Sequence, residues 1–242
     1  MMQKPQTLKP ALLESVPFDT LSGNVHKIQQ RLEKNRYPGQ AAAKLIAVTK
    51  TVAPGVINQL KPLGILDIGE NRAQVAMPKL AQIEPEFRLH WIGRLQTNKV
   101  KYIIEDVCML HTLDRVELAQ EVNRRAGEHG RVLSALVQVN IAGEEQKGGM
   151  PPEAVAAFLK QMKDFSSIHV QGLMSIMPLA APEEELERLF AGMRTLFEQM
   201  RDLAVEGVEM RELSMGMSND YEIAARHGAT MVRIGTALYR QD

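Results

Sequence analysis

Cysteine and long apolar runs are almost missing from this sequence. Only one of its 242 residues is a cysteine, Cys108, so no disulfide can form within the chain and a reducing compartment is favoured. No apolar run approaches the about 20 residues that a membrane-spanning helix needs. The first 15 residues contain no continuous apolar core, so they do not resemble a signal peptide. These absences predict a cytoplasmic protein that does not enter a membrane.

An excess of charge of either sign is also missing. The 29 Lys and Arg residues balance the 29 Asp and Glu residues, which leaves a formal net charge of +0. Such a chain has no strong basic field to attract nucleic acid or an anionic membrane surface. Its six histidines show neither HxxxH nor HExxH spacing, so the sequence does not support a metal site. We therefore expect no nucleic acid, membrane or metal among its partners.

Short β-branched runs alternate with longer amphipathic stretches along the whole chain. An opening helix is predicted over about 20–35, because Leu21, Val25, Ile28 and Leu32 recur on one helical face. Strands are predicted over 45–49, 65–68, 89–92, 107–110, 133–140, 168–173, 212–214 and 230–234. Helices are predicted from about 54, over 71–82, over 114–129, from 151, over 182–206, from 218 or 219, and through 239.

Eight alternating units predict a single (β/α)₈ barrel of the TIM type with an extra N-terminal helix, a fold that typically takes about 250 residues. An open doubly wound sheet is the alternative, but it usually has a glycine-rich first turn. The turn at 50–54 contains no glycine. We expect residues 1–14 to form a flexible leader and residues 15–242 to form one domain, present as a monomer.

Polar residues stand where the predicted strands end, which is where barrel enzymes carry their active sites. Lys50 shares a strand face with Ile46, and Arg233 shares one with Met231. If these faces point into the barrel, both cations lie over its mouth. A lysine amine near apolar walls and a second cation loses part of its proton affinity. The deprotonated amine can then attack an aldehyde and form an imine.

The ends of the last two predicted strands indicate a phosphate site. In barrels the loops in this position, with a short extra helix, commonly bind phosphate. Gly235 and Thr236 open such a helix, Ser214 and Thr236 add hydroxyl donors, and Gly216 permits close backbone approach. A lysine nucleophile beside a phosphate site predicts a phosphorylated carbonyl compound. These features alone leave pyridoxal 5′-phosphate (PLP) and a sugar phosphate both open.

Several motifs resemble one known family, the PLP homeostasis proteins, which are related to the N-terminal barrel of alanine racemase. The matching segments are Ala47–Lys50, Gly69–Asn71, His90–Lys99, Gly172–Met174, Leu213–Asp220 and Val232–Gly235.

The resemblance implies a role for each matching residue. Lys50 would hold PLP as a Schiff base, Asn71 would lie beside the ring, and Arg233 would face the pyridine nitrogen. The phosphate would be held by Ser214, Gly216, Gly235 and Thr236, with Met215 counted among the cofactor-binding residues of the same run. Lys147 would act in moving PLP onto or off the protein.

The resemblance also bears on whether the protein is an enzyme. Arginine is permanently cationic and cannot protonate the pyridine nitrogen, so Arg233 would make the ring a weak electron sink. Alanine racemases add a second domain that completes their site, and this sequence ends at Asp242. We therefore expect a non-catalytic protein that buffers PLP and delivers it to apo-enzymes. A single-domain PLP-dependent racemase is the first alternative, and a sugar-phosphate aldolase or isomerase is the second.

Overall fold

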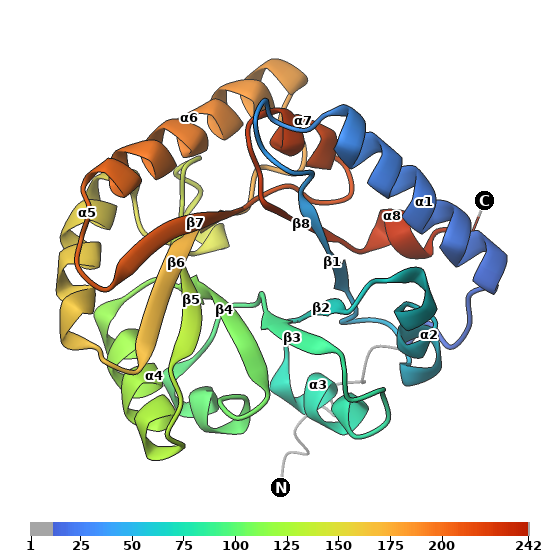
Figure 1. Cartoon of the computed structure of the whole chain (residues 1–242), viewed down its shortest axis with the longest axis horizontal. Coiled ribbons are helices and arrows are strands. Elements are labelled where there is room, and N and C mark those ends of the chain that lie inside the picture. The colour runs from blue at the N-terminus through green and yellow to red at the C-terminus, as the bar shows by residue number, and fades with distance from the viewer. Residues whose placement is uncertain (1–11, 242) are drawn as a thin grey trace, which may run out of the picture.

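Eight parallel strands close into a barrel, and helices surround it on the outside (Figure 1). The computed structural model describes residues 12–241. The strands are β1 (Lys44–Val48), β2 (Asp67–Glu70), β3 (Arg88–Trp91), β4 (Val107–Leu113), β5 (Leu133–Val139), β6 (Ile168–Ser175), β7 (Val208–Ser214) and β8 (Met231–Ile234). They are hydrogen-bonded in sequence order, and β8 returns to pair with β1, with Arg233 opposite Ile46.

The helices follow the strands in the alternating order that the sequence predicts. The α-helices are α1 (Phe18–Lys34), α2 (Pro54–Asn58), α3 (Ala73–Leu80), α4 (Val116–Glu128), α5 (Pro152–Gln161), α6 (Glu183–Asp202), α7 (Tyr221–Arg226) and α8 (Thr236–Tyr239). The 3₁₀ segments are η1 (Lys61–Leu63), η2 (Thr97–Tyr102), η3 (Glu145–Lys147) and η4 (Met162–Asp164). The predicted (β/α)₈ fold with an extra N-terminal helix is confirmed.

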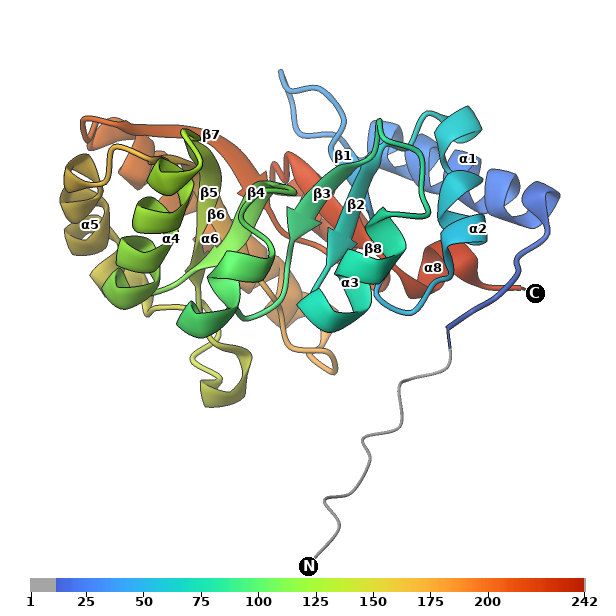
Figure 2. The same cartoon turned by 90° about the horizontal axis from the view of Figure 1, so that it is seen from below.

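The extra helix α1 covers the side of the barrel at the last helix, α8. Its predicted apolar face is the buried one, with Leu21, Val25, Ile28 and Leu32 all in the core. The Asn24 Nδ2 amide donates to the carbonyl oxygens of Leu238 at 3.0 Å and Arg240 at 2.9 Å. These bonds hold α1 against the last helix, α8, beside which it lies in both views (Figures 1 and 2).

Some boundaries differ from those predicted. Strand β4 runs to Leu113 and β7 begins at Val208, so both are longer than their apolar runs, while α2 has only 5 residues. The predicted leader, 1–14, lies mostly outside the described residues. Within it, Leu13 forms a parallel bridge with Val52. Among the residues described, no helix is long and apolar enough to cross a membrane.

Strand alternation separates two apolar clusters. The larger lies between the sheet and the helices and includes Leu45, Leu213 and Val232. The smaller fills part of the barrel interior and consists of Ile46, Met109, Leu136, Met174 and Met231. Because side chains alternate along a strand, the neighbours of this inner cluster two positions away also face inward. Several of those neighbours are polar, and they form the site described next.

Candidate functional site

Lys50 follows β1 at the end of the barrel where the strands finish. Ile46 on β1 faces the interior, and Lys50 lies in the turn two residues after the last residue of that strand, Val48. The Lys50 side chain is exposed. Within residues 12–241, no carboxylate lies within ion-pair distance of its Nζ, and no acceptor is bound to it. The amine is therefore available to a ligand that enters from the mouth.

A buried ion pair fixes the backbone just before Lys50. The Lys79 Nζ ammonium, on α3, donates to Glu70 Oε1 at 2.5 Å and to the carbonyl oxygen of Thr49 at 2.7 Å. Thr49 Oγ1 donates to the same Glu70 oxygen at 2.7 Å. The side chains of Lys79 and Glu70 are only 6% and 2% exposed. In such a dry position the pair and its hydrogen bonds through Glu70 Oε1 hold the ends of β1 and β2 together, while Glu70 Oε2 is buried without a partner.

Asn71 follows β2 directly and packs against the next loop. A Cβ atom added to Gly93 would lie 2.5 Å from the Asn71 Cβ and 2.7 Å from its Cα. Gly93 is therefore a glycine because the Asn71 backbone occupies the space that any side chain would need. The loop after β3 is held in turn by Thr112, whose Oγ1 donates to the Gly93 carbonyl oxygen at 2.8 Å. This contact sets the position of Asn71 beside the barrel mouth.

Arg233 points into the barrel, as its predicted face with Met231 requires, and it is buried. Its Nη1 donates to Ser214 Oγ at 2.7 Å, and its Nη2 donates to the carbonyl oxygen of Ser175 at 2.8 Å. Burial lowers the pKa of the guanidinium to about 10, which leaves it cationic at neutral pH. Three strands, β6, β7 and β8, therefore hold one fixed positive charge inside the mouth.

Arg233 is one end of a hydrogen-bond chain through the barrel interior, which we call the buried relay. It runs Arg233, Ser214, His111, His90 and Asp67. Ser214 Oγ lies 3.0 Å from His111 Nδ1, His111 Nε2 lies 2.9 Å from His90 Nδ1, and His90 Nε2 lies 2.8 Å from Asp67 Oδ1. Because the arginine can only donate, every later group can accept from one neighbour and donate to the next. When the hydrogen bonds are donated in this order from Arg233 to Asp67, neither histidine needs a proton on both ring nitrogens.

Burial and pairing set the charge states along the buried relay. Burial lowers the pKa of His111 well below its usual value, and the nearby cation Arg233 acts in the same direction. Burial disfavours the Asp67 carboxylate, but hydrogen bonds from His90 and Arg88 outweigh this and hold its pKa below the usual range. The relay thus has a carboxylate at one end, a guanidinium at the other and neutral His111 between them. The strand predicted over 107–110 continues to Leu113, so His111 lies inside β4 and is fully buried.

The loops after β7 and β8 meet at Ser218. Its Oγ accepts the backbone N–H of Gly235 at 3.3 Å and that of Ala237 at 3.1 Å. Gly216, which adopts a φ of 93°, is buried on the same loop, where an added Cβ would lie 2.6 Å from the Ala224 Cβ. The N–H groups of Gly235 and Ala237 thus both point to Ser218 Oγ. Thr236 is exposed beside them.

Three of the predicted site residues have other contacts. The Ser214 hydroxyl is engaged inside the barrel by Arg233 and His111, so it positions Arg233 instead of joining the donors around Ser218. The Met215 side chain belongs to the apolar cluster between sheet and helices. Lys147, on η3, donates from Nζ to the Met177 carbonyl oxygen at 2.7 Å and pairs with Glu144 Oε2 at 2.5 Å.

Sequence reasoning gave no role to Lys79, Ser218 or the pair His90 and His111. Ser218 lies within Leu213–Asp220, one of the segments that resemble the family, and this resemblance could have indicated a role for it. Lys79 follows Ala76 by one helical turn on the buried face of α3, where a lysine is unusual. The contact between His90 and His111 joins β3 and β4, and the sequence alone does not show that these two side chains meet.

Residues 17–242 match the family model described as alanine racemase, N-terminal domain. The chain is 38% identical over 222 residues to the pyridoxal phosphate homeostasis protein of Aquifex aeolicus, covering 91% of this chain and 96% of that protein. It is 34% identical to the protein of the same name from Pasteurella multocida, with 91% and 97% covered.

Solved structures show the same likeness. PipY of Synechococcus elongatus PCC7942, solved without PLP, superposes with a TM-score of 0.83 at 32% identity, covering 91% of this chain and all of that one (100%). PipY with PLP bound gives 0.81 at 31% identity. An alanine racemase of Clostridium difficile shares the fold with a TM-score of 0.76 at 16% identity, and this chain covers 60% of it.

Proposed function

Because this chain belongs to the alanine racemase N-terminal domain family, we propose that it binds PLP and takes part in PLP homeostasis, holding the cofactor as a Schiff base on Lys50. Its relatives at 34–38% identity carry the name pyridoxal phosphate homeostasis protein, and PipY has been solved with PLP bound. PLP supplies an aldehyde that an amine can capture and a phosphate that anchors it. The residues at the barrel mouth fit both requirements.

Each part of the cofactor has a matching group in the site. The exposed Lys50 amine, which has no bound partner in the described part of the chain, is the group that captures the aldehyde. The backbone N–H groups of Gly235 and Ala237, which here donate to Ser218 Oγ, would turn to the phosphate together with the Ser218 and Thr236 hydroxyls. Asn71 would lie beside the ring, and Arg233 would face the pyridine nitrogen.

The fixed guanidinium of Arg233 would make bound PLP a weak electron sink, which suits racemase-like chemistry or little chemistry at all. Of these two, the name shared by the relatives favours the carrier. Strong electron withdrawal by the ring requires a protonated pyridine nitrogen, and an arginine keeps its proton at neutral pH, so it can donate a hydrogen bond there but cannot transfer the proton. Ser214 and Ser175 hold the guanidinium in place, so no acid can replace it there without disrupting two hydrogen bonds. The site therefore supports reversible capture of PLP through the exposed Lys50 amine. We propose delivery to apo-enzymes in the cytoplasm as its use.

Delivery is tested by mixing the PLP-loaded protein with an apo PLP-dependent enzyme in the presence of a phosphatase that destroys free PLP. We expect enzyme activity to recover to a level that an equal amount of free PLP cannot reach. Lys50→Ala should lose this ability, while Lys101→Ala, which changes an exposed lysine on η2, should keep it. Equal recovery with free PLP and with the loaded protein would contradict delivery.

A racemase remains the alternative because its fold matches. The same preparations should be tested for racemisation of several L-amino acids. We expect no turnover above that of the Lys50→Ala variant. Turnover that depends on Lys50 would show that the protein is an enzyme and would contradict the carrier function.

A further inference from the structure

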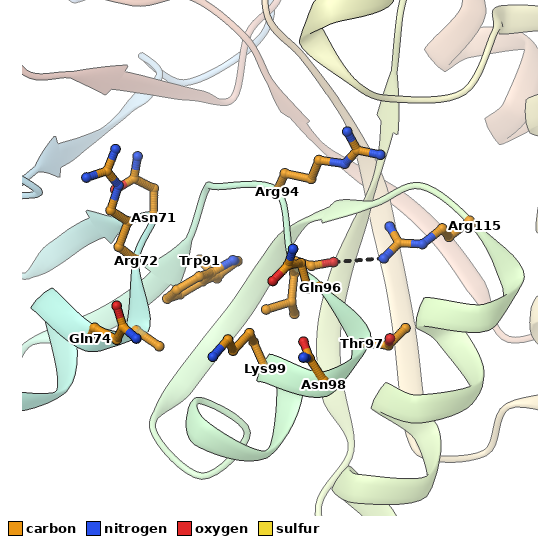
Figure 3. A pocket seen from close by; sticks show the side chains of 12 residues that line it. Asn71, Arg72, Gln74, Trp91, Arg94, Gln96, Thr97, Asn98, Lys99 and Arg115 are labelled. Atoms are coloured by element: carbon orange, nitrogen blue, oxygen red, sulfur yellow. Dashed lines mark hydrogen bonds between the residues drawn. The ribbon is translucent and has the colours of Figure 1, made fainter. Parts of the chain in front are cut away.

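A cavity lies outside the barrel mouth, between α3 and η2. Its volume is about 960 Å³, and its walls come from the loops after β2 and β3 and the start of α4. Figure 3 shows the side chains that line it. Of the residues assigned to the PLP site only Asn71 is among them. A cavity of this size could hold a small organic molecule.

Positive charge dominates this cavity. Arg72, Arg94, Lys99 and Arg115 line it, and no carboxylate does. Arg115 is neutralised, because it pairs with Asp114 and donates to the Leu95 carbonyl oxygen at 2.9 Å. For Arg72, Arg94 and Lys99, no carboxylate lies within ion-pair distance among residues 12–241. In the described part of the chain, the Lys99 Nζ contacts the Tyr102 ring, 5.3 Å from its centroid. Three cations from two adjacent loops thus share one hollow without an anion.

A buried donor without a partner lies in the same cavity. Trp91 is 2% exposed and faces away from the barrel interior, and its indole Nε1 has no hydrogen-bond partner. Most buried donors in proteins are paired, so an orphaned one requires an explanation. In Figure 3 the nitrogen-bearing edge of the ring is turned toward the side of the cavity that Gln96 occupies. An acceptor bound there, after a rotation of the exposed Gln96 side chain, would satisfy it.

We propose that this cavity, the α3–η2 cleft, is a second ligand site that binds a phosphate-bearing small molecule of at least two negative charges. Guanidinium and ammonium groups bind phosphate oxygens through charge-assisted hydrogen bonds, and the Trp91 N–H adds a neutral one. The amides of Gln74, Gln96 and Asn98 can serve the remaining polar atoms. The inference does not depend on PLP binding, because none of these cations belongs to the PLP site.

Trp91 also supplies the measurement, because it is the single tryptophan of the sequence. Its fluorescence should change in a saturable way when pyrophosphate or ADP is titrated at low ionic strength, and calorimetry should give the same affinities. Adenosine, which has no charge, should bind at least tenfold more weakly than ADP. Binding of pyrophosphate alone would identify a site for inorganic phosphates, and tighter binding of ADP would identify an organic one. Either result supports the cleft as an anion site.

Variants separate the cleft from the phosphate site at the barrel mouth. Arg94→Gln and Lys99→Gln should each weaken binding about tenfold or more, since a hydrogen bond between charged groups is worth at least that factor. Lys101→Gln is the matched control. It lies on the same 3₁₀ segment and faces the same Tyr102 ring at 5.0 Å, but it does not line the cleft. Its affinity should stay within about twofold of wild type.

Thermal unfolding will check that the variants fold. We expect them to fold, because Arg94 is exposed and Lys99 is partly exposed. No binding of either probe by the wild type would overturn the inference. So would binding that Arg94→Gln and Lys99→Gln leave unchanged, because the anion would then sit elsewhere, for example at Ser218. If Lys50 failed to bind PLP, the inference about the α3–η2 cleft would be unaffected.

Discussion

His90 Nδ1 lies 2.9 Å from His111 Nε2, and the two rings meet nearly edge to face, at 71°, inside the barrel. This contact connects Asp67 at one end of the interior with Ser214 and Arg233 at the other. Because both rings can remain neutral, the buried relay satisfies its polar groups without placing a third charge in the core. The position of the Arg233 guanidinium therefore depends on residues that never reach the ligand.

The low pKa of His111 predicts how stability depends on pH. Folded His111 stays neutral, whereas in the unfolded chain a histidine takes up a proton below a pH of about 6.5. The unfolded state then binds more protons, so stability is complete above that pH and decreases as the pH falls below it, by at most about 1.4 kcal/mol per pH unit for this group. Urea denaturation between pH 7 and pH 5 measures the slope.

His111→Gln should flatten this slope, whatever its effect on absolute stability at pH 7. His26→Gln is the control, because it removes an exposed histidine from α1. It should leave the slope as in the wild type. An unchanged slope in His111→Gln would show that His111 titrates in the same way in both states.

The Lys79–Glu70 pair predicts a strong dependence of stability on both partners. Lys79→Met leaves the buried Glu70 carboxylate without its cation and should lower the free energy of unfolding by about 3–5 kcal/mol. The double variant Lys79→Met with Glu70→Leu removes both charges and should be less destabilised than Lys79→Met alone. Urea denaturation at pH 7 compares them.

Lys61 provides the surface counterpart of this pair. It contacts Glu84 and Glu86 on the exposed side of the protein. Lys61→Met should therefore leave the free energy of unfolding close to that of the wild type. Equal losses in Lys61→Met and Lys79→Met would mean that the interior pair does not fix the β1 and β2 ends.

Gly93 predicts opposite outcomes for two glycine-to-alanine changes. The alanine Cβ at 93 would meet the Asn71 backbone, which cannot turn away as a side chain can. Gly93→Ala should thus lower the melting temperature and weaken PLP binding by displacing Asn71. Gly23→Ala, on α1 with nothing within 4 Å of the new Cβ, should stabilise the protein by about 0.5–1 kcal/mol. Calorimetry measures both, and a neutral Gly93→Ala would contradict the close approach.

The sequence predicted the fold well wherever apolar periodicity was uninterrupted, as in α1, β5 and α6. It predicted β7 as too short, because Glu209 and Arg211 interrupt the apolar pattern and only Met210 between them is buried. The inward face of Arg233 followed from the period of two along a strand. The buried relay could not be predicted in this way, since it depends on which strands become neighbours across the barrel interior.

The same limit applies to the phosphate donors and to the α3–η2 cleft. Ser218 contacts Gly235 and Ala237 only after β8 has paired next to β7. The pattern around Trp91 indicated an ordinary strand residue, and its orphaned nitrogen becomes visible only with the surrounding loops in place.

The covalent role of Lys50 is tested most directly by reducing the PLP-treated protein with borohydride, digesting it and mapping the pyridoxyl-phosphate label by mass spectrometry. We predict a label on the peptide that contains Lys50, at close to one per chain, and loss of that label in Lys50→Ala. A label on Lys147 or on other lysines, with Lys50 unmodified, would contradict the account.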